Sequence, residues 1–506
     1  MAKIREAYDE LKTRMAEVAE FETIRWVLDW DEQTELPSSG ATWRGRQAAL
    51  IDGISHERAT DPKIGELISE LEVAGDTLGD TDSAERVNLR EWRRDYDRRV
   101  KLPKKLVEEM TRTTVEARNA WVEARKNNNF SSFSPWLEKV YQLSREAADH
   151  YGHDGERYDA LLAGYEPGIT AAQAGEMLRD LRTRLVPLIE AVAGAERHPD
   201  RSNLLGNFPI AQQQAFTHDA VSWIGYDLER GSIGEAAHPF CITLGPNDVR
   251  FCTRYSEKDF SDALTSSLHE GGHGIYEQGL PVEHFGTPLG TAVSLGVHES
   301  QSRMWENRIG RSHAFWETWL PRAAKRFPEL AGRKVDDVHF AINDVKPSLI
   351  RVEADEVTYN LHILIRYELE VALLSGELAV NDLPDAWNEK VKAYLGIDVP
   401  DDSTGCMQDI HWSVGLIGYF PTYALGNIYS AQFVEAAEKD LGPFEELMKK
   451  GEQQVIRDWF REHVHSQGRR YLPADLVKRV TGEAPSAEAL TVYLSDKVSK
   501  LYGVKV

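Results

Sequence analysis

The sequence predicts a mainly α-helical fold in which one large helical body carries a small β-sheet. Apolar residues recur every three or four positions through most of the 506 residues, as they do in amphipathic helices. A single stretch near residue 245 alternates as strands do. The chain also has no Ser/Gly-rich tether, low-complexity block or fixed-length repeat. This favours one body over the roughly three domains that length alone suggests.

The first helix is predicted from an apolar stripe in an otherwise charged segment, formed by Ile4, Tyr8, Leu11, Met15, Val18 and Phe21. Similar patterns predict helices at about 84–127, 131–151, 171–195, 313–345, 352–376 and 443–464. Breaks fall at Pro37, Gly40, Pro103, Gly164, Pro167, Pro384 and Pro400. We interpret these breaks as helix ends rather than domain linkers.

Residues 239–255 predict two short strands, 239–245 and 249–255, joined by a turn. In the second strand Val249, Phe251 and Tyr255 would share one face, and Arg250 and Arg254 the other. This hairpin stands directly before the strongest motif of the chain, so we expect the small sheet to lie beside a functional site.

Composition excludes several classes of protein. There are 59 Lys and Arg against 82 Asp and Glu, which gives a formal net charge of −23. Nucleic-acid and anionic-membrane surfaces need clustered basic residues, so neither partner is expected. The three cysteines, Cys241, Cys252 and Cys406, are a poor disulfide framework. With no apolar signal core near the N-terminus and no apolar run of ~18 residues, we expect a cytoplasmic protein.

An H-E-x-x-H motif occupies residues 269–273, on a helix predicted from about 259 to 278. Its apolar stripe is made by Phe260, Leu264, Leu268 and Ile275. On this helix His269 and His273 lie one turn apart and can provide two corners of a tetrahedral Zn²⁺ site. Glu270 lies beside them, where it can accept a proton from a metal-bound water without being a ligand. The two glycines inside the helix imply close approach by a ligand or a neighbouring backbone.

A catalytic zinc site needs a third protein ligand. The segment 298–301, His-Glu-Ser-Gln, opens another predicted helix that ends near Gly310. Glu299 and Glu306 share a face of this helix, so spacing alone does not choose between them. Glu277 and Glu283 are too close to the end of the first helix to fold back easily. A solvated surface charge is the alternative for each of these carboxylates.

Six motifs in order resemble the signatures of the carboxypeptidase Taq family of metallocarboxypeptidases. They are the segments 238–240 (HPF), 248–253 (DVRFCT), 269–273 (HEGGH), 298–301 (HESQ), 350–356 (IRVEADE) and 405–412 (GCMQDIHW). The segment 30–37 also resembles the N-terminal part of that family.

The resemblance implies an almost all-helical fold with a deep substrate groove, a small sheet along it, and a homodimer. It implies removal of C-terminal residues from peptides with broad side-chain preference, proline excepted. It also makes Glu299 the third metal ligand, and Zn²⁺ the usual metal with Co²⁺ as a possible substitute. We expect a single domain over residues 1–506, with N-terminal helices (1–200) covering the groove and the catalytic part at about 205–430.

Further residues are candidates for binding the carbonyl oxygen of the scissile bond and the C-terminal carboxylate of the substrate. His411 and Tyr423 are candidate donors to the developing oxyanion. Arg351 is the candidate partner of the substrate's free α-carboxylate, although an i,i+4 salt bridge to Asp355 would explain it equally well. Arg250 is the alternative anchor.

His238, in the first of the six motifs, is a further candidate for substrate binding. We expect the peptide to add along the edge of the hairpin by main-chain hydrogen bonds, which would explain tolerance for many side chains.

Two other functions use the same residues. A zinc endopeptidase or oligopeptidase would share the metal chemistry and differ only in how it recognises the chain end. A non-enzymatic helical scaffold could keep a structural metal, but a closed structural site would use four protein ligands and no adjacent free carboxylate.

Overall fold

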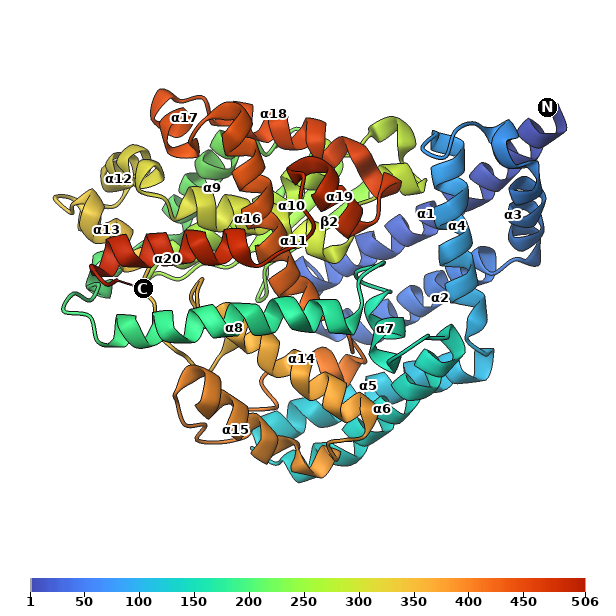
Figure 1. Ribbon diagram of the computed structural model, residues 1–506, viewed down its shortest axis with the longest axis horizontal. Helices are drawn as coiled ribbons and strands as arrows, with labels where there is room; N and C mark the ends of the chain where they lie inside the picture. The colour runs from blue at the N-terminus through green and yellow to red at the C-terminus, as the bar shows by residue number, and fades with distance from the viewer. Residues whose placement is uncertain (1, 506) are drawn as a thin grey trace.

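The computed structural model describes residues 2–505, except for the side chain of Asp76, and is mainly helical (Figure 1). Nine α-helices precede the sheet in this part of the chain: α1 (Ala2–Thr34), α2 (Ala41–Ala59), α3 (Pro62–Ala74), α4 (Ala84–Lys101), α5 (Lys104–Lys126), α6 (Phe130–Tyr151), α7 (Arg157–Leu162), α8 (Ala171–Ala193) and α9 (Ile210–Ile224). Eleven follow it: α10 (Phe260–Gly279), α11 (Leu295–Arg303), α12 (His313–Arg326), α13 (Val335–Ile342), α14 (Tyr359–Ser375), α15 (Leu383–Leu395), α16 (Pro421–Leu441), α17 (Phe444–Lys450), α18 (Gln453–His463), α19 (Pro473–Thr481) and α20 (Glu488–Tyr502).

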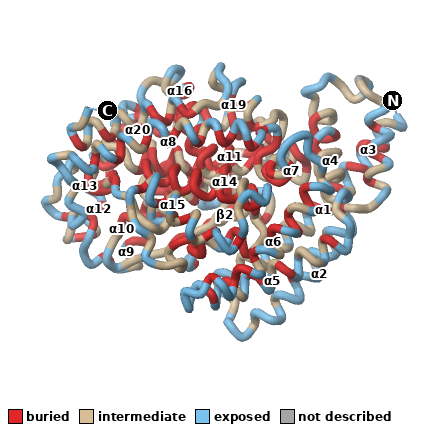
Figure 2. The backbone as a smooth tube through the Cα atoms, turned by 60° about the horizontal axis from the view of Figure 1, so that its bottom comes forward, coloured by how far each residue is buried: buried red, intermediate tan, exposed pale blue. Residues whose placement is uncertain are grey.

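One hydrophobic core runs through most of the molecule. It includes buried residues from Ala117 on α5 to Tyr502 on α20, and Figure 2 shows this buried backbone around α8, α11 and α14. A smaller cluster joins α1, α3 and α4 at the end of the molecule that carries the N-terminus, with Leu11, Ile68 and Trp92 at its centre. The apolar stripe predicted for the first helix supplies part of this second cluster.

The predicted hairpin is present, with one strand more than expected. Strands β2 (Phe240–Gly245) and β3 (Asp248–Thr253) are antiparallel, and β1 (Ile233–Glu235) pairs with β3 in parallel. The strand order is therefore β1-β3-β2. With only three residues, β1 is too short to show alternation in the sequence. The sheet packs against α10, so it lies beside the H-E-x-x-H motif as expected.

Three of the predicted helices were wrong in extent. The segment predicted at 443–464 is two helices, α17 and α18, because Gly451, with φ of +77°, ends the first of them. The segment predicted at 313–345 is two helices, α12 and α13, because Pro328 and Gly332, with φ of +79°, interrupt it. The segment predicted at 352–376 begins only at Tyr359. Asp355 accepts the backbone N–H groups of Val357 and Thr358 and so forms the turn that precedes α14.

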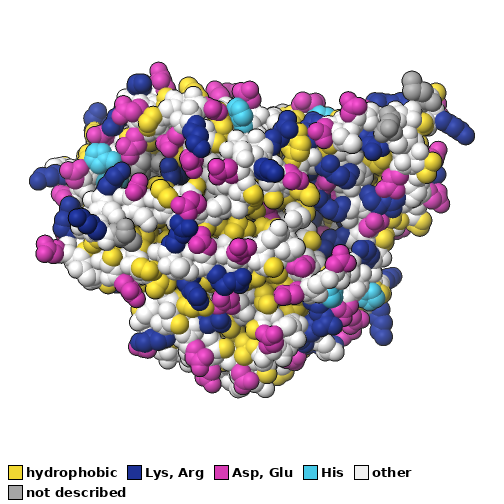
Figure 3. All heavy atoms as spheres, in the orientation of Figure 1, with side chains coloured by type: hydrophobic (Ala, Val, Ile, Leu, Met, Phe, Trp, Pro, Cys, Tyr) yellow, Lys and Arg dark blue, Asp and Glu magenta, His cyan; other side chains and the backbone are white. Residues whose placement is uncertain are grey.

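The surface and the thiols agree with the composition. Acidic and basic side chains are interspersed on the face shown in Figure 3. All three cysteines are free thiols. Across residues 2–505, no helix combines the length and the apolar character that crossing a bilayer would require.

Gly272 allows α10 and α11 to approach each other closely. A Cβ at this position would lie 2.8 Å from the Cα of Ser302 and 3.0 Å from the carbonyl oxygen of Gln301. Both are backbone atoms of α11, so a side chain would separate the helices. The glycine in the motif therefore has a structural reason, which is the approach of a neighbouring backbone.

We expect Gly272→Ala to lower the free energy of unfolding by about 1–3 kcal/mol, as overpacking does. Gly271→Ala is the matched control, because its Cβ would meet side-chain atoms and no backbone, with Val221 at 3.3 Å and Ile224 at 3.8 Å. Denaturant unfolding of both variants measures the difference. Equal stabilities would show that α11 yields to the added methyl group at no cost.

Candidate metal centre

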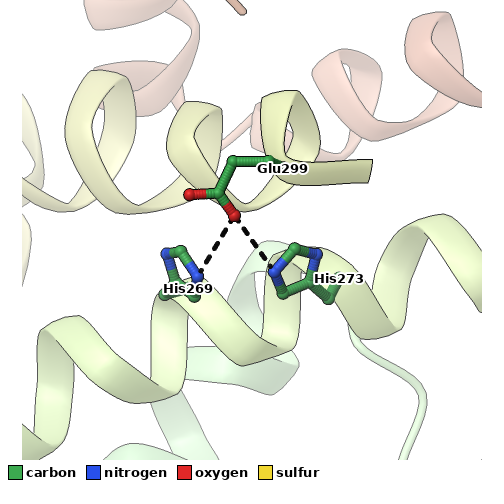
Figure 4. Close-up of side chains that lie close together, drawn as sticks. All are labelled: His269, His273 and Glu299. Atoms are coloured by element: carbon green, nitrogen blue, oxygen red, sulfur yellow. Dashed lines mark ion pairs between the residues drawn. The ribbon is translucent and has the colours of Figure 1, made fainter. Parts of the chain in front are cut away.

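Three side chains from two helices point toward one another (Figure 4). His269 and His273 project from α10, and Glu299 projects from α11 above them. Glu299 Oε2 lies 3.6 Å from His269 Nε2 and 3.4 Å from His273 Nε2. Ligand atoms around a tetrahedral zinc at the usual bond lengths lie about 3.3 Å apart. The two imidazoles and the carboxylate therefore fit a divalent metal ion.

Glu306 also reaches this group, but from the other side of His269. Its Oε2 lies 2.8 Å from His269 Nδ1, the ring nitrogen that faces away from Glu299. Glu306 stands on a π-helical turn, Met304–Gly310, that continues α11. Both carboxylates left open by the sequence thus contact His269, and only Glu299 joins the group of possible ligand atoms. A carboxylate on the second nitrogen fixes the orientation of a metal-binding histidine.

His273 is held by a different chain of side chains. Its Nδ1 lies 2.5 Å from Nδ1 of His298, whose Nε2 lies 2.9 Å from Glu277 Oε1. Thr243, on β2, donates its hydroxyl to the other oxygen of Glu277 at 2.8 Å. The sequence argument, that Glu277 is too close to the end of the helix to fold back, applied only to direct binding of the metal by Glu277. It missed this indirect contact, although His273 and Glu277 lie one turn apart on the same helix.

Arg303 neutralises the two carboxylates. Its Nε donates to Glu299 Oε1 at 2.7 Å and its Nη1 to Glu306 Oε2 at 3.2 Å. Arg311 donates to Glu306 Oε1 at 3.3 Å. Burial alone would raise the pKa of Glu299, but the charges of Arg303 and His269 hold it well below the usual value. Glu299 is therefore ionised, as a metal ligand must be.

Burial acts differently on the other ionisable groups of the motif. It raises the pKa of Glu270 to about 7, and the negative charge of Glu299 adds to this effect. Burial and the neighbouring His298 lower the pKa of His273 to about 3, which keeps that imidazole neutral. Burial opposes the charge on His269, yet Glu299 and Glu306 raise its pKa to about 9. A metal ion at this site would have to displace the proton from His269.

The position of α11 depends on a buried carboxylate from a distant segment. Glu166, which follows α7, is fully buried and accepts the N–H of Gly296 at 2.9 Å and the hydroxyl of Ser294 at 3.0 Å. These donors belong to the first turn of α11 and to its N-cap. Nothing in the sequence indicated this contact, because it joins segments 130 residues apart.

A second cluster brings together Arg351, His411 and Tyr423. The guanidinium of Arg351 donates from both Nε and Nη2 to Asp409 Oδ1, at 3.0 and 2.8 Å. Its Cζ lies 5.0 Å from the centre of the Tyr423 ring. His411 Nε2 and the Tyr423 hydroxyl are 3.1 Å apart.

The predicted alternative for Arg351, an i,i+4 salt bridge to Asp355, was wrong. Arg351 lies on a short 3₁₀ turn, Arg351–Glu353, that precedes α14, and it pairs with Asp409 instead. Asp409 also accepts from the buried Arg366, so one carboxylate serves two guanidinium groups. Burial alone would raise the pKa of Asp409, but these two arginines hold it far below its usual value.

Tyr359 connects the two clusters. Its ring lies 4.3 Å from the Cζ of Arg303, on the metal side. Its hydroxyl accepts from Arg351 Nη1 at 3.1 Å. Tyr359 was not predicted from the sequence, because a tyrosine at the first position of a helix resembles any other core aromatic residue.

The two remaining predicted residues lie on the sheet and the loop before it. Arg250, on β3, donates from Nε and Nη2 to Asp248 at 2.7 and 2.8 Å and lies over the ring of Trp30 at 5.6 Å. His238 is exposed in the loop before β2. Neither belongs to the group of metal-ligand atoms.

Comparison with known proteins now identifies the family. The model of the carboxypeptidase Taq (M32) metallopeptidases matches residues 10–498. The chain belongs to this family.

Its relatives match along almost their whole length. Thermostable carboxypeptidase 1 of Thermus thermophilus is 47% identical, covering 98% of this chain and 99% of that protein. Carboxypeptidase 1 of Bacillus subtilis is 38% identical, covering 94% and 95%.

The fold agrees as well. A crystal structure of the M32 carboxypeptidase from Deinococcus radiodurans superimposes with a TM-score of 0.94 at 40% identity, covering 98% of this chain and 100% of that one. The protein is thus a metallocarboxypeptidase, a peptide hydrolase that uses a divalent metal. The mainly helical fold predicted from the sequence is confirmed.

We expect Glu306→Gln to weaken metal binding about 10- to 100-fold, because loss of the anionic partner leaves the imidazole of His269 less basic and less firmly oriented. Competition with a chromophoric chelator measures the affinity. Glu283→Gln is the control, since that carboxylate is exposed. Unchanged affinity in Glu306→Gln would show that His269 is oriented by packing alone.

Proposed function

We propose that this metallocarboxypeptidase is a zinc enzyme that hydrolyses C-terminal residues from peptides with broad specificity, and that Glu270 is its general base. The observation that carries the proposal is the convergence of His269, His273 and Glu299 with an adjacent, buried carboxylate that is not part of the ligand group. Two histidines and a glutamate are a usual ligand set of catalytic zinc. Co²⁺ is expected to substitute.

The bound ion would supply a Lewis acid that lowers the pKa of a coordinated water and polarises the scissile carbonyl. The residues of this chain provide the rest. His269, His273 and Glu299 would hold the ion, while Glu306 and His298 fix the two imidazoles. Three protein ligands leave further positions for water and substrate.

Glu270 is suited to accept the proton of the attacking water and to pass it to the leaving amine. Burial raises its pKa to about 7, and a general base works best when its pKa is close to the working pH. As a residue next to His269 on α10, it remains close to the ligands whatever peptide is bound.

His411 and Tyr423 are proposed to stabilise the oxyanion. Burial lowers the pKa of His411 to about 4, so the neutral ring donates a hydrogen bond without carrying a charge. Its Nε2 already contacts the Tyr423 hydroxyl. With the proton on Nε2, His411 donates to the Tyr423 oxygen and leaves the hydroxyl proton of Tyr423 free to donate to the oxyanion. A preorganised donor of this kind lowers the cost of charge that develops in the transition state.

Arg351 is proposed to recognise the α-carboxylate of the substrate. Arg351 and Arg366 share the single carboxylate of Asp409, so the cluster retains one excess positive charge. A buried excess charge favours an anionic ligand. Arg250 and His238 are proposed as secondary contacts to the peptide, with an extended substrate along the edge of the sheet.

The remaining expectations concern assembly and location. We propose one domain over residues 1–506, in which N-terminal helices (1–200) cover a deep groove and the catalytic part occupies about 205–430. A homodimer and a cytoplasmic location complete the proposal.

The rival endopeptidase would cleave a peptide that is acylated at its N-terminus and amidated at its C-terminus. Mass spectrometry of such a digest, beside the free-acid peptide, tests the direction of cleavage directly.

Glu270→Gln is expected to lower kcat by several orders of magnitude while metal remains bound, because the amide cannot accept a proton. Turnover of an N-acylated dipeptide and metal content measured on the same sample separate these effects. Near-normal turnover would refute the role of Glu270 as general base.

Arg351→Lys is expected to reduce kcat/KM for free-acid substrates much more than for their C-terminal amides, because lysine lacks the planar pair of donors. Arg469→Lys is the matched control, since Arg469 makes a similar paired contact with Asp95, is similarly enclosed and has no proposed contact with the peptide. If Arg351→Lys reduced the rates for acids and amides equally, Arg351 would have only a structural role.

A further inference from the structure

Arg303 is the last residue of α11 and contacts the group of ligand atoms from behind. It follows Glu299 by four positions and precedes Glu306 by three, so it lies on the same helical face as both. The ring of Tyr359 covers its guanidinium at 4.3 Å, and its side chain is only 14% exposed. These contacts leave the guanidinium little freedom to move.

The two oxygens of Glu299 have different partners. Oε1 accepts the short hydrogen bond from Arg303 Nε, at 2.7 Å. Oε2 lies 3.1 Å from the Ser302 hydroxyl, which makes its shorter hydrogen bond, at 2.7 Å, to the backbone carbonyl of Glu299. Oε2 also faces Nε2 of both histidines. Oε2 is therefore the oxygen that faces the two imidazoles, and Oε1 is occupied by Arg303.

This difference has a chemical consequence. A carboxylate can bind a metal through one oxygen or through both, and the second mode uses a coordination position. A hydrolytic site needs that position for water or for the substrate carbonyl. A donor that occupies Oε1 keeps that oxygen from the metal and holds the carboxylate of Glu299 in one orientation.

We propose that Arg303 is a positioning residue that restricts Glu299 to one-oxygen ligation and thereby keeps a coordination position open for the reaction. This inference rests on the proposed metal function of Glu299. It assigns a role to an arginine that lies outside the six motifs and contacts the metal site only through the ligand.

Tyr359 extends the arrangement toward the proposed substrate site. Its hydroxyl is held by Arg351, and its ring face lies against Arg303. The position of the Arg303 guanidinium is thus fixed by Glu299 and Glu306 on one side and by Tyr359 on the other. Through Tyr359, the cluster that contains Arg351 thus helps to hold Arg303 in place.

The test compares Arg303→Met and Arg303→Lys with Arg308→Met. Arg308 is a suitable control because it lies five positions further along, is similarly enclosed at 18% exposure, and contacts Tyr493 and Glu438 instead. Each protein is loaded with Co²⁺, whose visible absorption is stronger in four-coordinate than in five-coordinate sites. Metal affinity is measured by chelator competition.

We expect Arg303→Met to lose about 10- to 100-fold in Co²⁺ affinity and to show the weaker spectrum of a higher coordination number. Arg303→Lys retains a positive charge but donates from a single point, so its affinity falls less while the spectrum still changes. Arg308→Met should have the wild-type spectrum.

A wild-type spectrum in Arg303→Lys would overturn the proposal, because charge alone would then account for the effect. The same holds for a wild-type spectrum in Arg303→Met. If Arg303→Met does not fold, Arg303→Lys decides the question. Failure of the wild-type protein to bind Co²⁺ at all would instead refute the metal function on which the inference rests.

Discussion

The close contact between α10 and α11 is the constraint on which the rest of the site depends. His269 and His273 come from one helix and Glu299 from the other, so the ligand group exists only while these helices stay together. Gly272 permits the contact on one side of α11. On the other side, Gly426 of α16 leaves room for the side chain of Glu299, because a Cβ there would lie 2.5 Å from its Cγ. Gly272 thus allows α11 to lie close to α10, and Gly426 leaves room for the side chain of Glu299.

The ionised side chains near the contact between α10 and α11 are paired with oppositely charged side chains rather than exposed to solvent. Glu299 and Glu306 are both buried, and they share Arg303, with Arg311 completing the balance at Glu306. An unpaired buried carboxylate would shift its pKa upward and become neutral. Glu270 is the exception, since it has no arginine partner among these contacts and its pKa rises to about 7. Burial at the same site therefore leaves Glu299 and Glu306 ionised beside their arginine partners and gives Glu270 a pKa of about 7.

Local patterns predicted much of this structure. The period of apolar residues located most of the helices, and alternation located the β2–β3 hairpin. Helix geometry alone was sufficient to predict that the imidazoles of His269 and His273 lie one turn apart. The choice between Glu299 and Glu306 could not be made in this way, because residues seven apart share a helical face and both in fact reach His269.

Contacts between distant segments were not predictable from the sequence. Arg351 pairs with Asp409, 58 positions away, where the sequence suggested the nearer Asp355. Glu166, which is 130 positions from Gly296 in the sequence, holds the start of α11. Strand β1 has too few residues to show a period. Each of these features depends on the complete fold, which a local pattern does not encode.

The most direct measurement is anomalous X-ray diffraction at the zinc absorption edge from crystals of the zinc-loaded protein. We expect one strong peak about 2.0–2.2 Å from His269 Nε2, His273 Nε2 and a single oxygen of Glu299. A peak bound to Glu306 in place of Glu299, or no peak near the two imidazoles, would contradict it.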